Sequence, residues 1–267
     1  MNDCGKVYLV GAGPGDPSLI TVRGMELLQR ADVIVYDRLV HPDLLRYARP
    51  SASLVYCGKR PGHHTLPQEE INRILVKQAT AGKQVVRLKG GDPGMFARVG
   101  EEAAHCARHA IPYEIVPGVT AGLAAPLYAG IPLTHRGTAS SVAFVTGHGC
   151  GGEEPPSWGG LAEQVDTLVI YMGMSNLPQI RQSLLHHGRS PDTPVALIRW
   201  GTWKGRQETL SGTLGNIEEK VRQQKFASPA IIVVGEVVAY QKHLAWFEGG
   251  GSDTLNKEDD LEQGVMG

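Results

Sequence analysis

The chain has 267 residues, of which 26 are basic (Lys or Arg) and 27 are acidic, so its formal net charge at pH 7 is −1. This length suits one large or two medium domains, and the balanced charge does not suggest a protein that binds nucleic acid through a broad basic face. No stretch approaches the ~20 apolar residues of a membrane-spanning helix, and the N-terminus lacks the layout of a signal peptide, so we expect a cytoplasmic protein without a membrane partner.

The first part of the chain alternates short apolar runs with stretches of helical periodicity. We expect strands at residues 7–10, 33–36, 54–57, 85–88 and 113–116, and helices at 19–30, 41–48, 65–80 and 98–109. Thr65 and Gln68 form a capping-box pattern at the start of the third helix. Regular alternation of strand and helix predicts an α/β fold with a parallel sheet covered by helices.

The pattern changes after Pro117 and Gly118. We expect helices at 120–130, 176–187 and 214–224, strands at 141–145, 167–172, 194–200, 207–210 and 230–238, and a loop at 149–160. Several of these strands follow one another without a helix, which predicts a mixed sheet. The sequence therefore predicts an N-terminal α/β domain over residues 1–117, a C-terminal α/β domain over 118–246, and a disordered acidic tail over 247–267.

Two of the expected strands end in glycine-rich turns, GAGPGD at residues 11–16 and KGGDP at 89–93. Open α/β sheets bind ligands at the carboxyl ends of their strands, so two such turns suggest a shared cleft. Three strand ends also deliver the polar residues Asp37, Lys59 and Asp92 to the same expected edge. The basic residues near strand ends fit an anionic small substrate, although charges scattered on a solvated surface explain their positions equally well. They are Arg38, Lys59, Arg60, Lys89, Arg98 and Arg136.

Other chemistries have weaker support. The third glycine of a GxGxxG dinucleotide fingerprint is replaced by Asp16, whose carboxylate would repel a pyrophosphate, which disfavours a nicotinamide or flavin oxidoreductase. The chain has neither a GxxxxGK[ST] loop nor a GxSxG elbow. His105 and His109 have a spacing that can bind zinc, but a solvated helix surface explains them as well, and the four cysteines form no CxxC motif. We therefore expect no metal site.

A series of motifs then occurs in a fixed order along the chain. They are GAGPGDPSLIT, VIVYDRLV, GKR, HTLPQEEIN, VVRLKGGDP, VPGVTAGLAAPLYAGIPLTHRG, VTGH, YMGM and AIIVVGEVV. Together they resemble the tetrapyrrole methylase family over about residues 6–240. Within that family YDRLV, HTLPQEEIN and PLTHRG are similar to the branch that acts on uroporphyrinogen.

This resemblance implies two α/β domains with S-adenosylmethionine (SAM) bound in a cleft between them, and a homodimer. It also implies two methylations of uroporphyrinogen III, at C2 and C7, to give precorrin-2 for sirohaem, cobalamin or haem d1 synthesis, with S-adenosylhomocysteine as the second product. Another precorrin methylase of the family, a dinucleotide-dependent oxidoreductase and a non-catalytic binding domain are the alternatives. No nucleic acid is implied.

The resemblance also assigns roles to residues that match the family's motifs. It implies Asp37 as proton acceptor, Lys59 as proton donor, and Arg98 as a residue for substrate binding or base work. Since a guanidinium has a pKa above ~12, Asp37 needs fewer assumptions than Arg98 as the base. The implied cofactor-binding residues are Pro14, Gly90, Gly91, Asp92, Met95, Thr120, Ala121, Met172 and Gly201.

One segment departs from the family pattern, which usually reads GGDPFIFGRG. Here Gly94 replaces a phenylalanine, and Ala97 and Val99 replace glycines on either side of Arg98. Residues with a Cβ restrict the backbone more than glycine does. The departure therefore bears on the conformation of the loop and on the role of Arg98.

Overall fold

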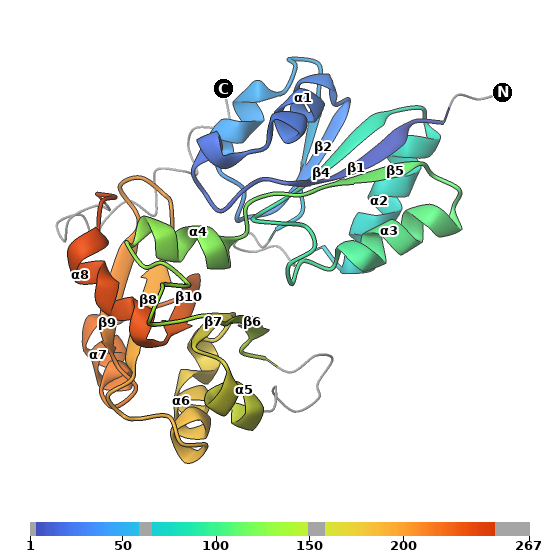
Figure 1. Ribbon diagram of the computed structural model, residues 1–267. Helices are drawn as coiled ribbons and strands as arrows, with labels where there is room; N and C mark the ends of the chain where they lie inside the picture. Colours follow the sequence, from blue (N-terminus) through green and yellow to red (C-terminus); the bar gives the residue numbers. More distant parts are fainter. Residues whose placement is uncertain (1–3, 59–65, 149–157, 249–267) are drawn as a thin grey trace. The chain divides into compact units, whose positions relative to one another are not determined.

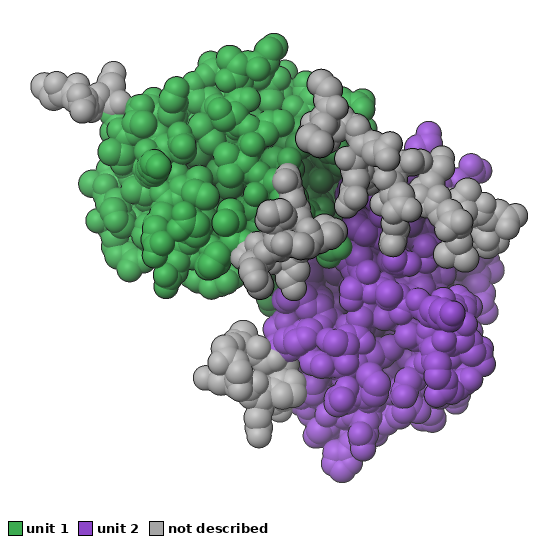
Figure 2. Space-filling view, turned by 180° about the vertical axis from the view of Figure 1, so that it is seen from behind, with its two compact units in different colours: residues 1–124 green, residues 125–267 purple. Residues whose placement is uncertain are grey.

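The computed structural model describes residues 4–58, 66–148 and 158–248 of the chain. The chain forms two compact units, residues 1–124 (unit 1) and 125–267 (unit 2), coloured separately in Figure 2. The division falls inside helix α4 (Ala121–Tyr128). The domain boundary expected after residue 117 stays a prediction, and most of the expected tail lies outside the described residues.

Unit 1 contains a five-stranded sheet in the order β3-β2-β4-β1-β5 (Figure 1). Its strands are β1 (Lys6–Gly11), β2 (Val33–Tyr36), β3 (Ser53–Tyr56), β4 (Gln84–Lys89) and β5 (Tyr113–Val116). Every neighbouring pair is parallel. The predicted parallel sheet is therefore confirmed, and its five carboxyl ends share one edge.

Helices cover both faces of this sheet, because strand residues alternate between two buried sides. On one face α2 (Gln68–Thr80) and α3 (Val99–Arg108) pack against Val7, Val35 and Val85. On the other, α1 (Val22–Arg30) and the 3-10 helix η2 (Pro42–Tyr47) pack against Val10, Ile34 and Val86. A further 3-10 turn, η1 (Pro17–Leu19), precedes α1, so that helix begins later than expected.

Unit 2 contains a second five-stranded sheet in the order β6-β7-β10-β8-β9 (Figure 1). Its strands are β6 (Val142–Thr146), β7 (Thr167–Tyr171), β8 (Pro194–Arg199), β9 (Glu208–Thr213) and β10 (Ala230–Val234). The pair β6–β7 is parallel, whereas β10 is antiparallel to β7 and β8, and β8 is antiparallel to β9. The predicted mixed sheet is confirmed.

One face of this second sheet packs on α5 (Trp158–Gln164), α6 (Leu177–His186) and α7 (Ile217–Gln224). Helix α5 was not expected, because its first residues fall in a segment that the sequence predicts as a loop; Trp158 and Ala162 anchor it in the core. The remaining elements are η3 (Met174–Asn176), η4 (Glu236–Tyr240) and α8 (Gln241–Leu244). Strand β10 is shorter than predicted because Gly235 turns the chain into η4 at a φ of 147°.

Candidate functional site

The two glycine-rich turns of unit 1 bond directly to each other. The Gly13 amide donates to the Gly91 carbonyl at 3.1 Å, and the Gly91 amide donates to the Gly13 carbonyl at 2.7 Å. Both glycines have left-handed backbones, with φ of 79° and 72°, a conformation that favours glycine. The expectation that both turns lie at one edge of one sheet is confirmed.

The carboxylate of Asp92 fixes the chain that follows β5. Its Oδ2 accepts a hydrogen bond from the Gly118 amide at 2.9 Å, and its Oδ1 accepts one from the Gly94 amide at 2.8 Å. Packing here is tight, because a Cβ on Gly118 would lie 2.5 Å from the Gly91 carbonyl oxygen. Asp92 therefore acts on the backbone of this edge, holding Gly118 beside the Gly91 turn.

This arrangement brings most predicted cofactor residues of unit 1 together. A Cβ on Gly91 would lie 3.6 Å from the Ala121 amide nitrogen and 3.9 Å from Thr120 Cα. Pro14 directly follows the bonded Gly13, and Met95 lies three residues beyond Asp92. Pro14, Met95, Thr120 and Ala121 are all half-buried, so part of each residue's surface is exposed.

Asp37 lies at the same edge, just beyond β2. Its Oδ1 accepts a hydrogen bond from the Leu39 amide at 3.0 Å, and a Cβ on Gly90 would lie only 2.7 Å from Leu39 Cβ. The turn that carries Asp37 thus packs on the glycine turn after β4. The structure brings the candidate base next to the predicted cofactor loop, as the order of strands in a parallel sheet leads us to expect.

Two buried cations sit behind Asp37 on β4. Arg87 donates to Asp37 Oδ2 at 3.5 Å through Nη2, and to Glu102 Oε1 at 3.1 Å through Nε. Lys89 donates to Glu102 Oε2 at 2.8 Å. Burial lowers the pKa of Lys89, and the nearby Arg87 lowers it further, while Glu102 raises it. Lys89 is buried and paired with Glu102. The expectation that Lys89 helps to bind an anionic substrate at the site edge is therefore wrong.

The sequence prediction missed Arg87 and Glu102. The sequence contained a signal. Arg87 lies within a run of buried apolar residues on its strand, and Glu102 lies beside Ala103 and Cys106 on the apolar face of α3. Charged residues at core positions are rare unless they are paired. Charges of opposite sign at buried positions of two elements, such as Arg87 and Glu102, indicate a buried ion pair.

Arg98 adopts a left-handed conformation at the start of α3, with a φ of 59°. Its guanidinium forms two 2.7 Å hydrogen bonds with Glu101, and these raise the pKa of Arg98. A raised pKa makes Arg98 a poorer proton acceptor. Phe96, with a φ of 54°, and Arg98 have left-handed backbones, whereas Ala97 and Val99, which replace the family's glycines, do not.

Lys59, the predicted proton donor, lies outside the described residues.

Unit 2 carries the other two predicted cofactor residues, at the ends of β7 and β8. Both strands are antiparallel to β10, which lies between them, so their carboxyl ends point to the same edge. Met172 follows β7 with a φ of 53° and is 52% exposed. Gly201 follows β8 and packs on α4, because a Cβ there would lie 2.3 Å from Ala125 Cβ.

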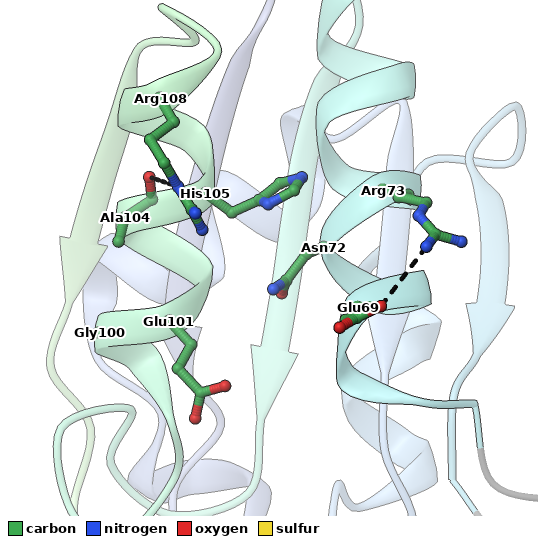
Figure 3. A pocket seen from close by; sticks show the side chains of 8 residues that line it. All are labelled: Glu69, Asn72, Arg73, Gly100, Glu101, Ala104, His105 and Arg108. Carbon is green, nitrogen blue, oxygen red and sulfur yellow. Dashed lines mark hydrogen bonds and ion pairs between the residues drawn. The ribbon is translucent and has the colours of Figure 1, made fainter.

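A separate groove of about 670 Å³ runs between α2 and α3 in unit 1 (Figure 3). Its charged side chains are partly neutralised by their neighbours, since Arg73 pairs with Glu69 and Arg108 donates to the Ala104 carbonyl. None of the predicted site residues lines it. We assign no ligand to this groove.

Among the described residues no helix is long and apolar enough to cross a membrane. In the same part of the chain, no three His, Cys, Asp or Glu side chains gather as a metal site.

Glycine turns and polar residues at the carboxyl ends of strands are how α/β proteins bind small molecules. A family model described as Tetrapyrrole (Corrin/Porphyrin) Methylases matches residues 6–218. The chain belongs to this family, and the resemblance seen in the sequence is confirmed.

Relatives and a solved structure agree with this membership. A uroporphyrinogen-III C-methyltransferase of Bacillus subtilis (strain 168) is 54% identical over 246 residues, which are 91% of this chain and 50% of that protein. One from Priestia megaterium is 55% identical over 237 residues, 88% of this chain and 99% of that protein. This chain thus spans about half the length of the first relative and nearly all of the second.

The structural comparison points to the same fold. The crystal structure of a uroporphyrin-III C-methyl transferase from Thermus thermophilus, complexed with S-adenyl homocysteine, is 40% identical to this chain. It matches with a TM-score of 0.75 and covers 88% of this chain and 99% of its own. The α/β fold with one parallel and one mixed sheet is therefore that of a tetrapyrrole methylase.

Proposed function

We propose that the chain is a SAM-dependent C-methyltransferase that methylates uroporphyrinogen III at C2 and C7 to give precorrin-2, a precursor for sirohaem, cobalamin or haem d1. The observation that carries this proposal is that, in a chain of this family, the predicted site residues of unit 1 meet at the carboxyl ends of the sheet's strands. There the Gly13 and Gly91 turns, the Asp92–Gly118 bond and the Asp37 turn meet.

The residues at this edge suit SAM. Close approach of a ligand to the backbone requires small residues. Both turns contain several glycines, and they meet at Gly13 and Gly91. The half-buried Pro14, Thr120 and Ala121 offer apolar surface and backbone groups beside it. We propose that Pro14, Gly90–Asp92, Met95, Thr120 and Ala121 of unit 1, and Met172 and Gly201 of unit 2, hold this cofactor.

SAM supplies a methyl group that is already activated on a sulfonium sulfur, so the protein mainly has to align the reactants. A proton must leave the macrocycle once its carbon has gained the methyl group. Asp37 is our candidate for the group that accepts it, because its side chain is 28% exposed at the edge and its Oδ1 position is fixed by the Leu39 amide. We propose Lys59 as proton donor from the family motif alone, and Arg98 as a substrate contact.

A homodimer and a cytoplasmic location belong to the same proposal, supported by the resemblance to the family. Sedimentation of the purified chain measures the first. A monomer at micromolar concentration would contradict it.

The activity is tested by incubating the chain with SAM and enzymatically made uroporphyrinogen III under reducing conditions. We expect products heavier by one and then two CH2 groups, with an equal amount of S-adenosylhomocysteine released. Unmethylated substrate after prolonged incubation would contradict the proposal.

The second candidate is another methylase of the same family, because the family model spans both corrin and porphyrin methylases. Methylation of a precorrin in place of uroporphyrinogen III would select it. The dinucleotide-dependent oxidoreductase loses its motif, because Asp16 caps the turn at η1 by accepting from the Ser18 amide at 2.9 Å.

A further inference from the structure

The charged residues of β4 occupy positions that the sheet assigns to its core. Arg87 and Lys89 follow Val85 at every second residue, on the face that α2 and α3 cover. Asp37 follows Val35 on the same face of β2. Side chains of a strand alternate between faces, so both cations point under the helices. Arg87 is 5% exposed and Lys89 is 3% exposed.

One carboxylate holds both cations there. Glu102 of α3 is completely buried. Its Oε2 accepts from Lys89, while its Oε1 accepts from Arg87 Nε and, at 3.2 Å, from Gln68 Nε2 of α2. Buried charges are costly unless they are paired and hydrogen-bonded. Without Glu102, Lys89 would lose its salt bridge, and Arg87 would keep the partly exposed Asp37 and two backbone carbonyls as partners among the described residues.

A purely structural role for this network is a weak explanation. Apolar residues of similar volume often stabilise a core as well as a buried ion pair, and the neighbouring strand residues on this face, Val7, Val35 and Val85, are apolar. The network also connects α3 to two parts of the candidate site. Through Arg87 it contacts Asp37, and its other member, Lys89, directly precedes Gly90. Both ends are parts of the candidate site.

We propose that Glu102 is a positioning residue for methyl transfer: it holds Arg87 against Asp37 and fixes Lys89 at the base of the Gly90–Asp92 turn. This inference rests on the proposed function. It assigns to Glu102 no contact with substrate or cofactor, because its side chain is fully buried in the unit.

The proposal predicts how charge redistributes when Glu102 is made neutral. In Glu102→Gln, Lys89 loses the carboxylate that raises its pKa, a pKa already lowered by burial and by Arg87. Arg87 is left with Asp37 as its carboxylate partner. Among the described residues, Cys57, beyond β3, also interacts electrostatically with Asp37, and burial raises the pKa of its thiol, so it adds no charge. Loss of the Glu102 charge therefore changes the charge balance beside Asp37.

The experiment compares Glu102→Gln with Glu70→Gln, a matched change on α2 whose side chain is 43% exposed and pairs with Arg73. Methyl transfer to uroporphyrinogen III is followed across pH, and S-adenosylhomocysteine affinity is measured by calorimetry. For Glu102→Gln we expect kcat to fall by about 100-fold, the size of effect that a misplaced group produces. The acidic limb of its pH profile should be displaced from that of the wild type, because the charges beside Asp37 have changed, whereas Glu70→Gln should match the wild type.

Two further variants separate positioning from general damage. If Glu102 acts through Asp37, adding Glu102→Gln to Asp37→Asn should cost little more kcat than Asp37→Asn alone, because coupled residues are not additive. Glu102→Asp keeps the charge, so it should restore the wild-type pH limb even if it folds less stably. Additive losses with an unmoved pH limb, or a displaced limb in Glu102→Asp, would overturn the proposal.

Failure of this inference is distinguishable from failure of the proposed function. A wild-type chain that does not methylate uroporphyrinogen III contradicts the function. An active wild type whose Glu102→Gln variant keeps its kcat and pH profile contradicts only the role of Glu102.

Discussion

At Asp37 each carboxylate oxygen has a different neighbour. Oδ1 accepts from the Leu39 amide, and Oδ2 faces the Arg87 guanidinium at 3.5 Å. A long contact to a cation leaves Oδ2 available as a proton acceptor. The Asp37 side chain is thus held in place while one carboxylate oxygen can still accept a proton, as a general base requires.

Replacing Asp37 by asparagine keeps its shape but removes the proton acceptor. We expect Asp37→Asn to lower kcat by about 100-fold or more, within the range that general bases contribute, while S-adenosylhomocysteine still binds. Single-turnover methylation and calorimetry measure the two effects. Asp43→Asn is the matched control, since Asp43 is 44% exposed and pairs with Arg46 on η2. Equal turnover in Asp37→Asn and the wild type would remove Asp37 as the base.

Gly118 tests the backbone packing of the same edge. A Cβ there would lie 2.5 Å from the Gly91 carbonyl oxygen and 2.8 Å from Gly11 Cα, and backbone atoms cannot rotate away. We expect Gly118→Ala to destabilise the chain by about 1–3 kcal/mol, as overpacking does, and to weaken S-adenosylhomocysteine binding. Denaturant unfolding and calorimetry measure both.

The control for that change is Gly160→Ala, at a position in α5 where a Cβ would meet no heavy atom within 4 Å. Alanine there should be neutral or should stabilise by about 0.5–1 kcal/mol, because it favours a helix more than glycine does. If Gly118→Ala behaved like Gly160→Ala, the tight packing at the edge would be contradicted.

Among the elements of unit 1, β1, α1 and β5 are tied by one acid. Glu114 of β5 accepts from Arg23 of α1 at 2.9 Å and from Lys6 of β1 at 2.8 Å. These bonds, first that from Arg23, lower the pKa of Glu114 to about 2. In an unfolded chain a glutamate has a pKa of about 4.3. The ionised Glu114 therefore stabilises the fold above about pH 4, and this contribution is lost as pH falls towards 2.

We accordingly expect Glu114→Gln to flatten the acid dependence of thermal stability. The wild type should lose Tm faster than the variant between about pH 4 and about pH 2, and the two curves should converge at the acid end. Glu69→Gln, at an 85% exposed side chain on α2, should leave the slope unchanged. Parallel curves for Glu114→Gln and the wild type would show that this tie contributes nothing measurable.

Sequence periodicity predicts the elements that bury an apolar face, and it fails where the signal is of another kind. Strand β4 and helix α2 follow from their spacing of apolar residues. Helix α5 does not, because it is short and begins within a Gly- and Pro-rich segment, so that Trp158 and Ala162, with the partly buried Leu161, give too few apolar positions to show a helical period. The end of β10 depends on the single residue Gly235, whose backbone conformation the apolar run does not reveal.

The candidate site divides in the same way. Glycine turns and strand-end acids are visible in the sequence, so Asp37 and Gly91 are found from pattern and resemblance. The partner of a buried charge is not visible, because Glu102 reaches Arg87 and Lys89 only once α3 has packed on the sheet. Long-range pairing of this kind is settled by packing and not by local spacing.

At the scale of the whole molecule, the two units each end their strands in residues proposed to bind SAM. Gly91 and Thr120 belong to unit 1, and Met172 and Gly201 belong to unit 2. Ligand binding to a folded chain stabilises it by an amount set by the ratio of ligand concentration to Kd. At 100 times the Kd, S-adenosylhomocysteine should stabilise the fold by about 2.7 kcal/mol.

Met172→Ala tests whether unit 2 contributes to this stabilisation. Met172 is 52% exposed beyond β7, so its loss should change intrinsic stability little, and alanine faces the same left-handed backbone. If its side chain contacts the cofactor, a tenfold rise in Kd would remove about 1.4 kcal/mol of the ligand-induced stabilisation. Thermal shifts over a ligand titration, with Leu244→Ala as a 46% exposed control in the same unit, measure it. Loss of affinity in Gly118→Ala but not in Met172→Ala would remove the Met172 side chain from the cofactor contacts, and Gly201 would then be the remaining candidate in unit 2.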